Sequence, residues 1–189
     1  ESFNISVSLT EHYEKYDGLP THRKLELLKK EKGLESKNFK KIWKLKQDLT
    51  LKVIDEIDIK IPKITLLVKK LSKKYRVMVA SNSIRQTVKK MLQKLDIYDD
   101  VEFFLSNDDV EHPKPHPEIY WKCMIRAGVT PKETIVIEDS FVGRTAAIDS
   151  GATLFAVKNP KDLLKKDLPE FVKKFNNTKM KNVWHDPNI

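Results

Sequence analysis

The chain has a single cysteine and lacks any long apolar run. Cys123 has no cysteine to pair with, so no disulfide forms within the 189 residues, and the composition suits a reducing cytoplasm. No stretch of 18 apolar residues occurs, so the sequence predicts no membrane span and no membrane partner. Repeats and low-complexity linkers are also absent. With 40% hydrophobic and 33% charged residues, the composition is that of a globular protein with room for a sizeable core.

Arginine is scarce although the net charge is +9. Only five of the 36 basic residues are arginine, and the lysines are spread along the polar faces of predicted helices. Nucleic-acid-binding domains usually concentrate arginine and aromatic residues in one stripe. We therefore interpret the charge as solvated surface and expect no nucleic-acid partner. A positive field could still attract phosphorylated metabolites.

Two apolar runs end in polar residues in a way that predicts a ligand site. Residues 135–137 (Ile-Val-Ile) run into Glu138 and Asp139, and residues 77–80 (Val-Met-Val-Ala) run into residues 81–83 (Ser-Asn-Ser). Continuous β-branched runs are typical of strands buried on both faces of a parallel sheet, and such sheets bind ligands at the carboxyl ends of their strands. Two adjacent carboxylates there favour a hard cation such as Mg²⁺.

A lysine between two prolines is the third signal. In the stretch 112–117 (His-Pro-Lys-Pro-His-Pro), Lys114 is flanked by Pro113 and Pro115, which lower the entropy cost of holding the loop. A compact ammonium group suits the neutralisation of a phosphoryl group. Other features are expected to be structural: Cys123 shares a helical face with apolar residues, and His112 and His116 are polar loop residues.

The pattern along the chain predicts two parts. Residues 1–58 read as an all-helical domain, and residues 59–189 alternate strands and helices, which implies a parallel sheet with right-handed crossovers. Strands are expected at 76–81, 101–105, 134–138 and 152–157. Helices are expected at 10–17 and 20–32, from Ser36 as N-cap to about 58, and from Pro62 onward. Further helices are expected at 83–95 (with Ser83 as N-cap), at 117–127, after strand 134–138 to about 149, and at 168–175. The alternation at Phe3–Leu9 fits a short strand.

With these residues in order, the chain resembles the haloacid dehalogenase (HAD) superfamily, and most closely its β-phosphoglucomutase-like subgroup. Ser81 matches the second motif of that family, Lys114 the third, and Glu138 with Asp139 the fourth. The resemblance implies an α/β fold, a Rossmannoid parallel sheet flanked by helices with a small helical cap domain. It makes Phe3–Leu9 a loop of that cap.

The resemblance also implies a chemistry. It makes the protein a Mg²⁺-dependent phosphatase or phosphotransferase that acts on a small phosphorylated metabolite through an aspartyl-phosphate intermediate. Asp139 and Glu138 would hold the metal, and Lys114 would neutralise the phosphoryl group. Ser81 and the backbone N–H of Asn82 would bind phosphoryl oxygens. Frequency within the family favours a phosphatase over a mutase.

Additional positions are more open. His22 and Arg23 follow the turn at 18–21 in a region that helps to select the substrate in the subgroup, although solvated helix residues would look the same. Arg144 could reach a phosphate or lie on the surface. The oligomeric state stays open.

The first motif of the family, Asp-x-Asp-Gly, is missing. The nearest stretch, residues 55–58 (Asp-Glu-Ile-Asp), has the wrong spacing. We expect the nucleophilic aspartate about 25–35 residues upstream of Glu1, so that the chain as given is inactive. The alternatives are a catalytically inactive HAD-like binding or regulatory protein and, less favoured, a nucleic-acid binder. Because the first strand of the family lies between 76–81 and 134–138, we expect these two strands to close on each other or to receive a partner's segment.

Overall fold

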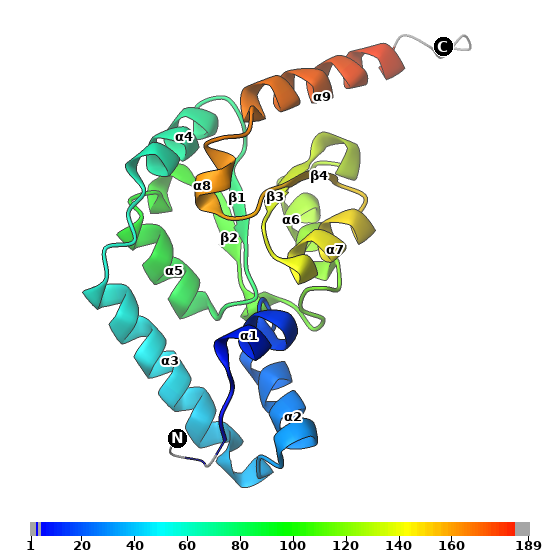
Figure 1. Cartoon of the computed structure of the whole chain (residues 1–189). Helices are drawn as coiled ribbons and strands as arrows, with labels where there is room; N and C mark the ends of the chain where they lie inside the picture. Colours follow the sequence, from blue (N-terminus) through cyan, green and yellow to red (C-terminus); the bar gives the residue numbers. More distant parts are fainter. Residues whose placement is uncertain (1–2, 4, 184–189) are drawn as a thin grey trace.

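The computed structural model describes residue 3 and residues 5–183, the last six of these by backbone alone. Helices dominate, and four short strands lie among them (Figure 1). None of the described helices is both long and apolar enough to cross a membrane. The family-level expectation of an α/β architecture with parallel strands is confirmed.

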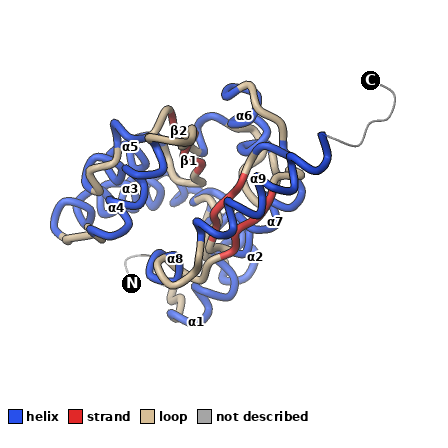
Figure 2. Tube along the Cα trace, turned by 90° about the horizontal axis from the view of Figure 1, so that it is seen from above, coloured by secondary structure: helices blue, strands red, loops and turns tan. Residues whose placement is uncertain are grey.

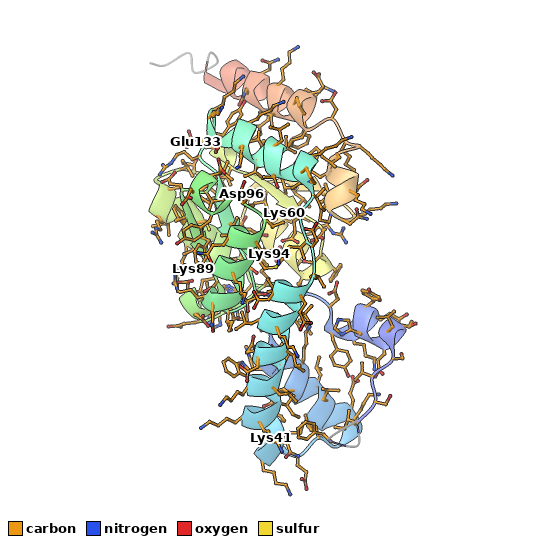
Figure 3. The ribbon with its side chains drawn as sticks, turned by 90° about the vertical axis from the view of Figure 1, so that its left-hand side faces the viewer. Lys41, Lys60, Lys89, Lys94, Asp96 and Glu133 are labelled. Carbon is orange, nitrogen blue, oxygen red and sulfur yellow. The ribbon has the colours of Figure 1, made fainter. Side chains whose placement is uncertain are left out.

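The first part of the chain is helical, as expected. It comprises α1 (Leu9–Glu11), which continues as a π-helical turn (His12–Tyr16), then α2 (Thr21–Lys32) and α3 (Phe39–Glu56). Gly33 ends α2 with φ +71°, a left-handed conformation that glycine adopts without steric cost. Figure 3 shows α3 running from the far end of the molecule, near Lys41, towards the connection at Lys60. The domain boundary at residue 58 remains a prediction.

Two expectations for this part are wrong. Ser36 does not cap the long helix, because it begins a 3₁₀ turn (Ser36–Asn38) and α3 starts only at Phe39. The alternating stretch Phe3–Leu9 is not a strand over its described residues: residues 5–8 have no regular structure and Leu9 opens α1, while Asn4 lies outside the described residues. The loop assignment that the family resemblance implies agrees with this.

The strands form two separate parallel pairs. β1 (Met78–Ala80) pairs with β2 (Phe103–Leu105), and β3 (Ile135–Glu138) pairs with β4 (Thr153–Ala156). All four lie inside the predicted ranges but are shorter. Within residues 5–183 the β1 and β3 edges pair with no further strand. The expectation that these two strands close directly on each other is therefore wrong, and no other described segment of this chain pairs between them. The alternative, a segment supplied by a partner, stays a prediction.

Helices cover the strand pairs on both sides (Figures 1 and 2). The remaining α-helices are α4 (Pro62–Ser72), α5 (Arg85–Lys94), α6 (Glu118–Ala127), α7 (Phe141–Asp149), α8 (Pro160–Leu163) and α9 (Leu168–Val183). Short 3₁₀ turns lie at Tyr98–Asp100, Asn107–Asp109 and Pro131–Glu133. Helix α9 extends beyond the predicted 168–175.

The apolar core follows the strands. One cluster joins β1, β2 and β3 to α6 and α7 and contains Ile119, the most deeply buried large side chain. A second packs α5 on β1 and β2, and a third packs α4 and α9 on β3 and β4. Cys123 is buried in the first cluster, as expected, and burial raises the pKa of its thiol to about 11.

Ser83 is not the N-cap of the following helix. Helix α5 starts at Arg85, and the carboxylate of Asp108 accepts its first N–H at 2.7 Å. A carboxylate at this end also compensates the positive pole of the helix dipole. This cap comes from a residue 23 positions later in the sequence, so local sequence patterns could not reveal it.

Candidate active site

A cavity of about 420 Å³ lies between the carboxyl ends of β1 and β3. Residues from the turn after β1, the loop with Lys114, the turn after β3, and the helical part of the chain line it together. The lining includes Ser81, Asn82, Lys114, Glu138 and Asp139. The structure therefore brings together in one cavity the five core residues that the sequence singled out, from three segments that are separated by about 20–30 positions.

Lys114 is buried at the centre of this arrangement. Its side chain is 7% exposed, and its Nζ donates to Glu138 Oε2 at 2.8 Å and to the Ala80 carbonyl oxygen at 3.1 Å. The ammonium also lies 4.7 Å from the centre of the Tyr120 ring. A buried charge needs such partners because desolvation alone would cost several kcal/mol. The lysine is thus fixed with its charge directed at the carboxyl ends of both strands.

Glu138 is held by five hydrogen bonds. Its Oε1 accepts from the Asp139 and Ser140 N–H groups and from the Ser140 hydroxyl, each at 3.0 Å. Its Oε2 accepts from Lys114 and from the Tyr120 hydroxyl at 2.9 Å. Burial would raise the pKa of this carboxyl, but Lys114 and these donors outweigh it and hold the pKa well below its usual range. Glu138 is therefore an ionised anchor for the lysine.

Tyr120 and Gly143 support Glu138, and sequence reasoning missed both roles. Tyr120 lies on the buried face of α6 and is 6% exposed; a tyrosine on an apolar helix face needs a partner for its hydroxyl, and this was the available signal. At Gly143 an added Cβ would lie 2.1 Å from Glu138 Cδ. Only glycine leaves room for the carboxylate, while its N–H donates to the N-cap hydroxyl of Ser140.

Asp139 is exposed at the rim of the cavity. Partial burial and the neighbouring Glu138 carboxylate raise the pKa of its carboxyl. The two neighbouring carboxylates thus differ: Glu138 is largely buried and engaged by five donors, and Asp139 is exposed to the cavity.

The metal prediction can be tested against this donor set. Within the described residues no group of three His, Cys, Asp or Glu side chains is arranged to hold a metal ion. Asp139 offers an accessible carboxylate, and Glu138 stands next to it with its oxygens engaged. Asp139 is therefore the residue of this chain that would hold a Mg²⁺ ion, and it would supply only one of the six oxygen ligands that this ion prefers.

The turn after β1 positions Ser81 and Asn82. The Ser81 N–H extends the β1–β2 ladder by donating to the Leu105 carbonyl at 3.0 Å, and its hydroxyl accepts from the Ser83 N–H at 3.1 Å. The Asn82 amide donates to the Gly18 carbonyl at 2.9 Å and to the Lys114 carbonyl at 3.1 Å, while its oxygen accepts from the Lys114 N–H at 3.0 Å. The Asn82 side chain therefore joins the lysine loop to the helical part, a role that the sequence did not suggest.

The helical part contributes Gly18, Leu19 and Lys46 to the cavity. Gly18 has φ +72°, and a Cβ there would lie 2.6 Å from Val142 Cγ2, so the glycine permits both the turn and the close approach to α7. Lys46 was not predicted; it is exposed as a residue, and the partial burial of its ammonium lowers its pKa. His22 and Arg23 lie exposed on the first turn of α2 and are not among the residues that line the cavity. Their proposed role in substrate selection stays a prediction.

The neighbouring polar residues have structural contacts. His116 Nδ1 accepts from the Glu118 N–H at 3.2 Å, and its ring packs on His112 and Trp121. Arg144 does not line the cavity. These contacts agree with the expectation that the two histidines are loop residues.

The fold and this constellation define the class. A family model described as haloacid dehalogenase-like hydrolase matches residues 1–157, so the chain belongs to that family. Among solved structures, a β-phosphoglucomutase from Clostridium difficile superposes with a TM-score of 0.77 at 22% identity, covering 95% of this chain and 86% of that one. This likeness shows the fold.

Two curated relatives are similar over part of the chain. A pyrophosphatase, PpaX from Bacillus cereus (strain AH820), is 35% identical over 85 residues, which are 44% of this chain and 38% of that protein. A phosphorylated carbohydrates phosphatase from Thermotoga maritima is 31% identical over 80 residues, covering 42% and 37%. The similarity thus spans less than two fifths of the length of either relative.

Proposed function

We propose that the chain forms part of a magnesium-dependent phosphatase or phosphotransferase that acts on a small phosphorylated metabolite. The observation that carries this proposal is the meeting of the Lys114 ammonium, the Ser81 hydroxyl and the exposed Asp139 carboxylate in one cavity. An ammonium, hydrogen-bond donors and a cation site are the elements that phosphoryl transfer needs, because its transition state spreads negative charge over the transferred oxygens. Relatives named for pyrophosphate and for phosphorylated carbohydrates support this substrate class.

Each residue of the site has a role in this proposal. Lys114 neutralises the phosphoryl group, and Ser81 with the N–H of Asn82 binds its oxygens. Asp139 holds the magnesium ion, which would supply charge neutralisation on the transferred group. Glu138 holds the Lys114 ammonium in place through the bond to its Oε2. Lys46 faces the cavity from the helical side and attracts the anionic substrate.

The nucleophile is the part of the proposal that these residues do not provide. The carboxylates that line the cavity are Glu138, which five hydrogen bonds engage, and Asp139, which we assign to the metal. We propose that a carboxylate from outside the 189 residues attacks phosphorus and forms a phospho-aspartyl intermediate. Residues 1–189 alone are then expected to bind phosphorylated ligands without hydrolysing them.

The test measures phosphate release from a panel of phosphorylated sugars and pyrophosphate. The protein encoded by the complete gene should release phosphate with Mg²⁺ and lose this activity in EDTA, with Asp139→Asn, and with Lys114→Met. The matched control is Lys132→Met, an exposed lysine outside the cavity. Residues 1–189 should be inactive in the same assay.

Two results would contradict the proposal. Hydrolysis by rigorously purified residues 1–189 that disappears with Asp139→Asn would show that the attacking residue is misassigned. A complete gene product that binds phosphorylated sugars but releases no phosphate would favour the alternative, a catalytically inactive binding or regulatory protein.

A further inference from the structure

A groove of about 250 Å³ lies where α4 meets α8 and the start of α9 (Figure 1). It shares no lining residue with the candidate active site. Its floor consists of leucines that also belong to the third core cluster, namely Leu67, Leu163 and Leu168. Leu66 and Leu164 line it as well and are 54% and 39% exposed. The groove therefore carries the apolar core outward to the surface.

The charged residues that line the groove are all lysines. They are Lys63, Lys70 and Lys166. Lys166 pairs with Asp162 at 3.5 Å, but among the described residues Lys63 and Lys70 enter no ion pair, in contrast to Lys69, which pairs with Asp96. The groove thus combines an apolar floor with uncompensated positive charge. A complementary ligand is apolar along its centre and anionic along its edges.

The spacing of the lining residues on α4 is that of one helix face. They follow the pattern i, i+3, i+4 and i+7: Lys63, Leu66, Leu67 and Lys70. At about 1.5 Å per residue, Lys63 and Lys70 lie roughly 10 Å apart along the helix. Two exposed ammonium groups therefore flank Leu66 with a repeat of seven residues. A second helix with carboxylates seven residues apart matches this repeat.

The size and the backbone chemistry of the groove indicate which occupant it fits. Sites for drug-sized ligands usually have about 300–1,000 Å³, so this groove is small for one. No described strand lines it, so an extended peptide finds no strand edge to pair with. A hollow also disfavours a bilayer, which requires apolar side chains that project from the surface. A helix satisfies its own backbone groups and can fill the hollow with side chains alone.

We propose that this groove is a docking site for an acidic amphipathic helix of a partner protein. The partner helix places apolar side chains against Leu66, Leu67 and Leu164, and its flanking glutamates or aspartates pair with Lys63 and Lys70. The leucines supply affinity because their contact removes apolar surface from water, and the lysines select an acidic partner. The docking site does not rest on the proposed function, since it lies apart from the candidate active site.

The experiment uses the protein encoded by the complete gene and a synthetic acidic helix, acetyl-Ser-Glu-Leu-Ala-Gln-Leu-Glu-Ala-Glu-Leu-Ala-Gln-Leu-Glu-Ala-amide. This peptide has its leucines on one helix face and glutamates at seven-residue intervals on either side of them. Fluorescence anisotropy of the labelled peptide measures the affinity. A peptide of the same composition, reordered so that the leucines are spread around the helix, keeps the charge and the hydrophobicity and should not bind.

Substitutions in the groove separate the apolar part from the charged part. Leu66→Glu should weaken binding by about tenfold or more, because it removes an apolar contact and places a carboxylate opposite the glutamates. Its matched control is Leu49→Glu, since Leu49 on α3 is 51% exposed and does not line the groove. Lys63→Gln and Lys70→Gln should each weaken binding by about 1.5- to 5-fold, the range for an exposed ion pair, and added salt should reduce this difference.

An exchange of charge tests the selection of an acidic partner. The double variant Lys63→Glu and Lys70→Glu should reject the acidic peptide and bind the same peptide with lysine in place of each glutamate. The parent protein should show the opposite preference. Because both lysines are exposed, this variant keeps the test valid if Leu66→Glu fails to fold.

Several results would overturn the proposal. These are equal affinity for the reordered peptide, undiminished affinity with Leu66→Glu, or an unchanged charge preference in the double variant. Failure of the complete gene product to bind the acidic peptide would also overturn it. Binding to vesicles of phosphatidylcholine and phosphatidylglycerol that Leu66→Glu abolishes, without binding of the peptide, would assign this surface to a membrane instead.

Discussion

On the α/β side of the cavity, Lys114 and Glu138 are largely buried and held by several hydrogen bonds. On the helical side, Lys46 faces the cavity and is loosely held. Lys114 and Glu138 are 7% and 11% exposed and share their hydrogen bonds with Ala80, Tyr120 and Ser140. Lys46 on α3 is exposed, and within residues 5–177 it forms no ion pair. The α/β side of the cavity therefore presents fixed side chains, and the helical side presents an adjustable one.

Breaking the Lys114–Glu138 pair should cause the largest loss of stability. Lys114→Ala leaves a buried carboxylate without its cation, so we expect the free energy of unfolding to fall by about 3–5 kcal/mol. Urea unfolding measures it. The control Lys132→Ala, at an exposed site, should change stability by less than about 0.5 kcal/mol. In a Glu138→Gln background the cost of Lys114→Ala should shrink, and an undiminished cost would show that the pair is not what stabilises the site.

Gly143→Ala should cause the second-largest loss of stability. Its Cβ would collide with the Glu138 carboxylate, and overpacking of this kind costs about 3 kcal/mol at the upper end of its usual range. The same urea experiment applies. In a Glu138→Ala background the clash is absent, so the substitution should become nearly neutral there. A cost that persists in that background would place the strain in α7 instead of at the carboxylate.

The sequence predicted the fold well where local pattern and burial agree. The four strands, the parallel pairing and the helices α4 to α7 follow from apolar runs and 3.6-residue periodicity, and the ends of β1 and β3 place Ser81 and Asp139 at one cavity as expected. The predicted N-cap at Ser83 is wrong because a tertiary contact, Asp108 on the first N–H of α5, takes that place. The predicted N-cap at Ser36 is wrong because Ser36 begins a 3₁₀ turn ahead of α3.

The site itself was predictable in its residues but not in its bonding. Motif order indicated Lys114 and Glu138, yet no pattern showed that Glu138 Oε2 would accept hydrogen bonds from both Lys114 and Tyr120. That outcome depends on which side chains meet across α6 and β3. The lack of pairing between β1 and β3 was also unexpected, since one core cluster contains residues of both strands although no strand pairing joins them.

Tyr120→Phe should have a moderate effect. The substitution removes one donor from Glu138 but keeps the ring beside Lys114, and hydrogen bonds to charged groups contribute about 1.5 kcal/mol. Thermal and urea unfolding should both show the loss. If Tyr120 contributes only packing, the phenylalanine variant will be as stable as the parent, and Glu138 will not depend on this donor.

Glu118 holds the lysine loop from outside and gives a pH dependence. Its carboxylate accepts from Lys122 and from the Glu111 and His112 N–H groups, and these partners lower its pKa from 4.5 to about 2. A carboxyl whose pKa falls on folding stabilises the protein above its unfolded pKa, and the contribution is lost as the pH falls from about 4.5 towards 2.

Glu118→Gln should therefore lower the Tm by about 2–4 °C at pH 7 and by less at pH 3. Calorimetry across this range measures the difference. An equal or larger loss at pH 3 would mean that the carboxylate charge does not anchor the loop.

The smallest effect on stability should come from the helical side, where Lys46→Gln is expected to change the free energy of unfolding by less than about 0.5 kcal/mol. Because the lysine faces the cavity, its loss should still weaken the binding of inorganic phosphate by about 1.5- to 5-fold, the range for one partly exposed charge, and added salt should reduce the difference. Lys44→Gln, an exposed lysine on the same helix that does not line the cavity, is the control and should change neither quantity. Equal phosphate affinity in both variants would remove the helical side from ligand binding. A stability loss with Lys46→Gln as large as that with Tyr120→Phe would erase the contrast between a fixed side and an adjustable one.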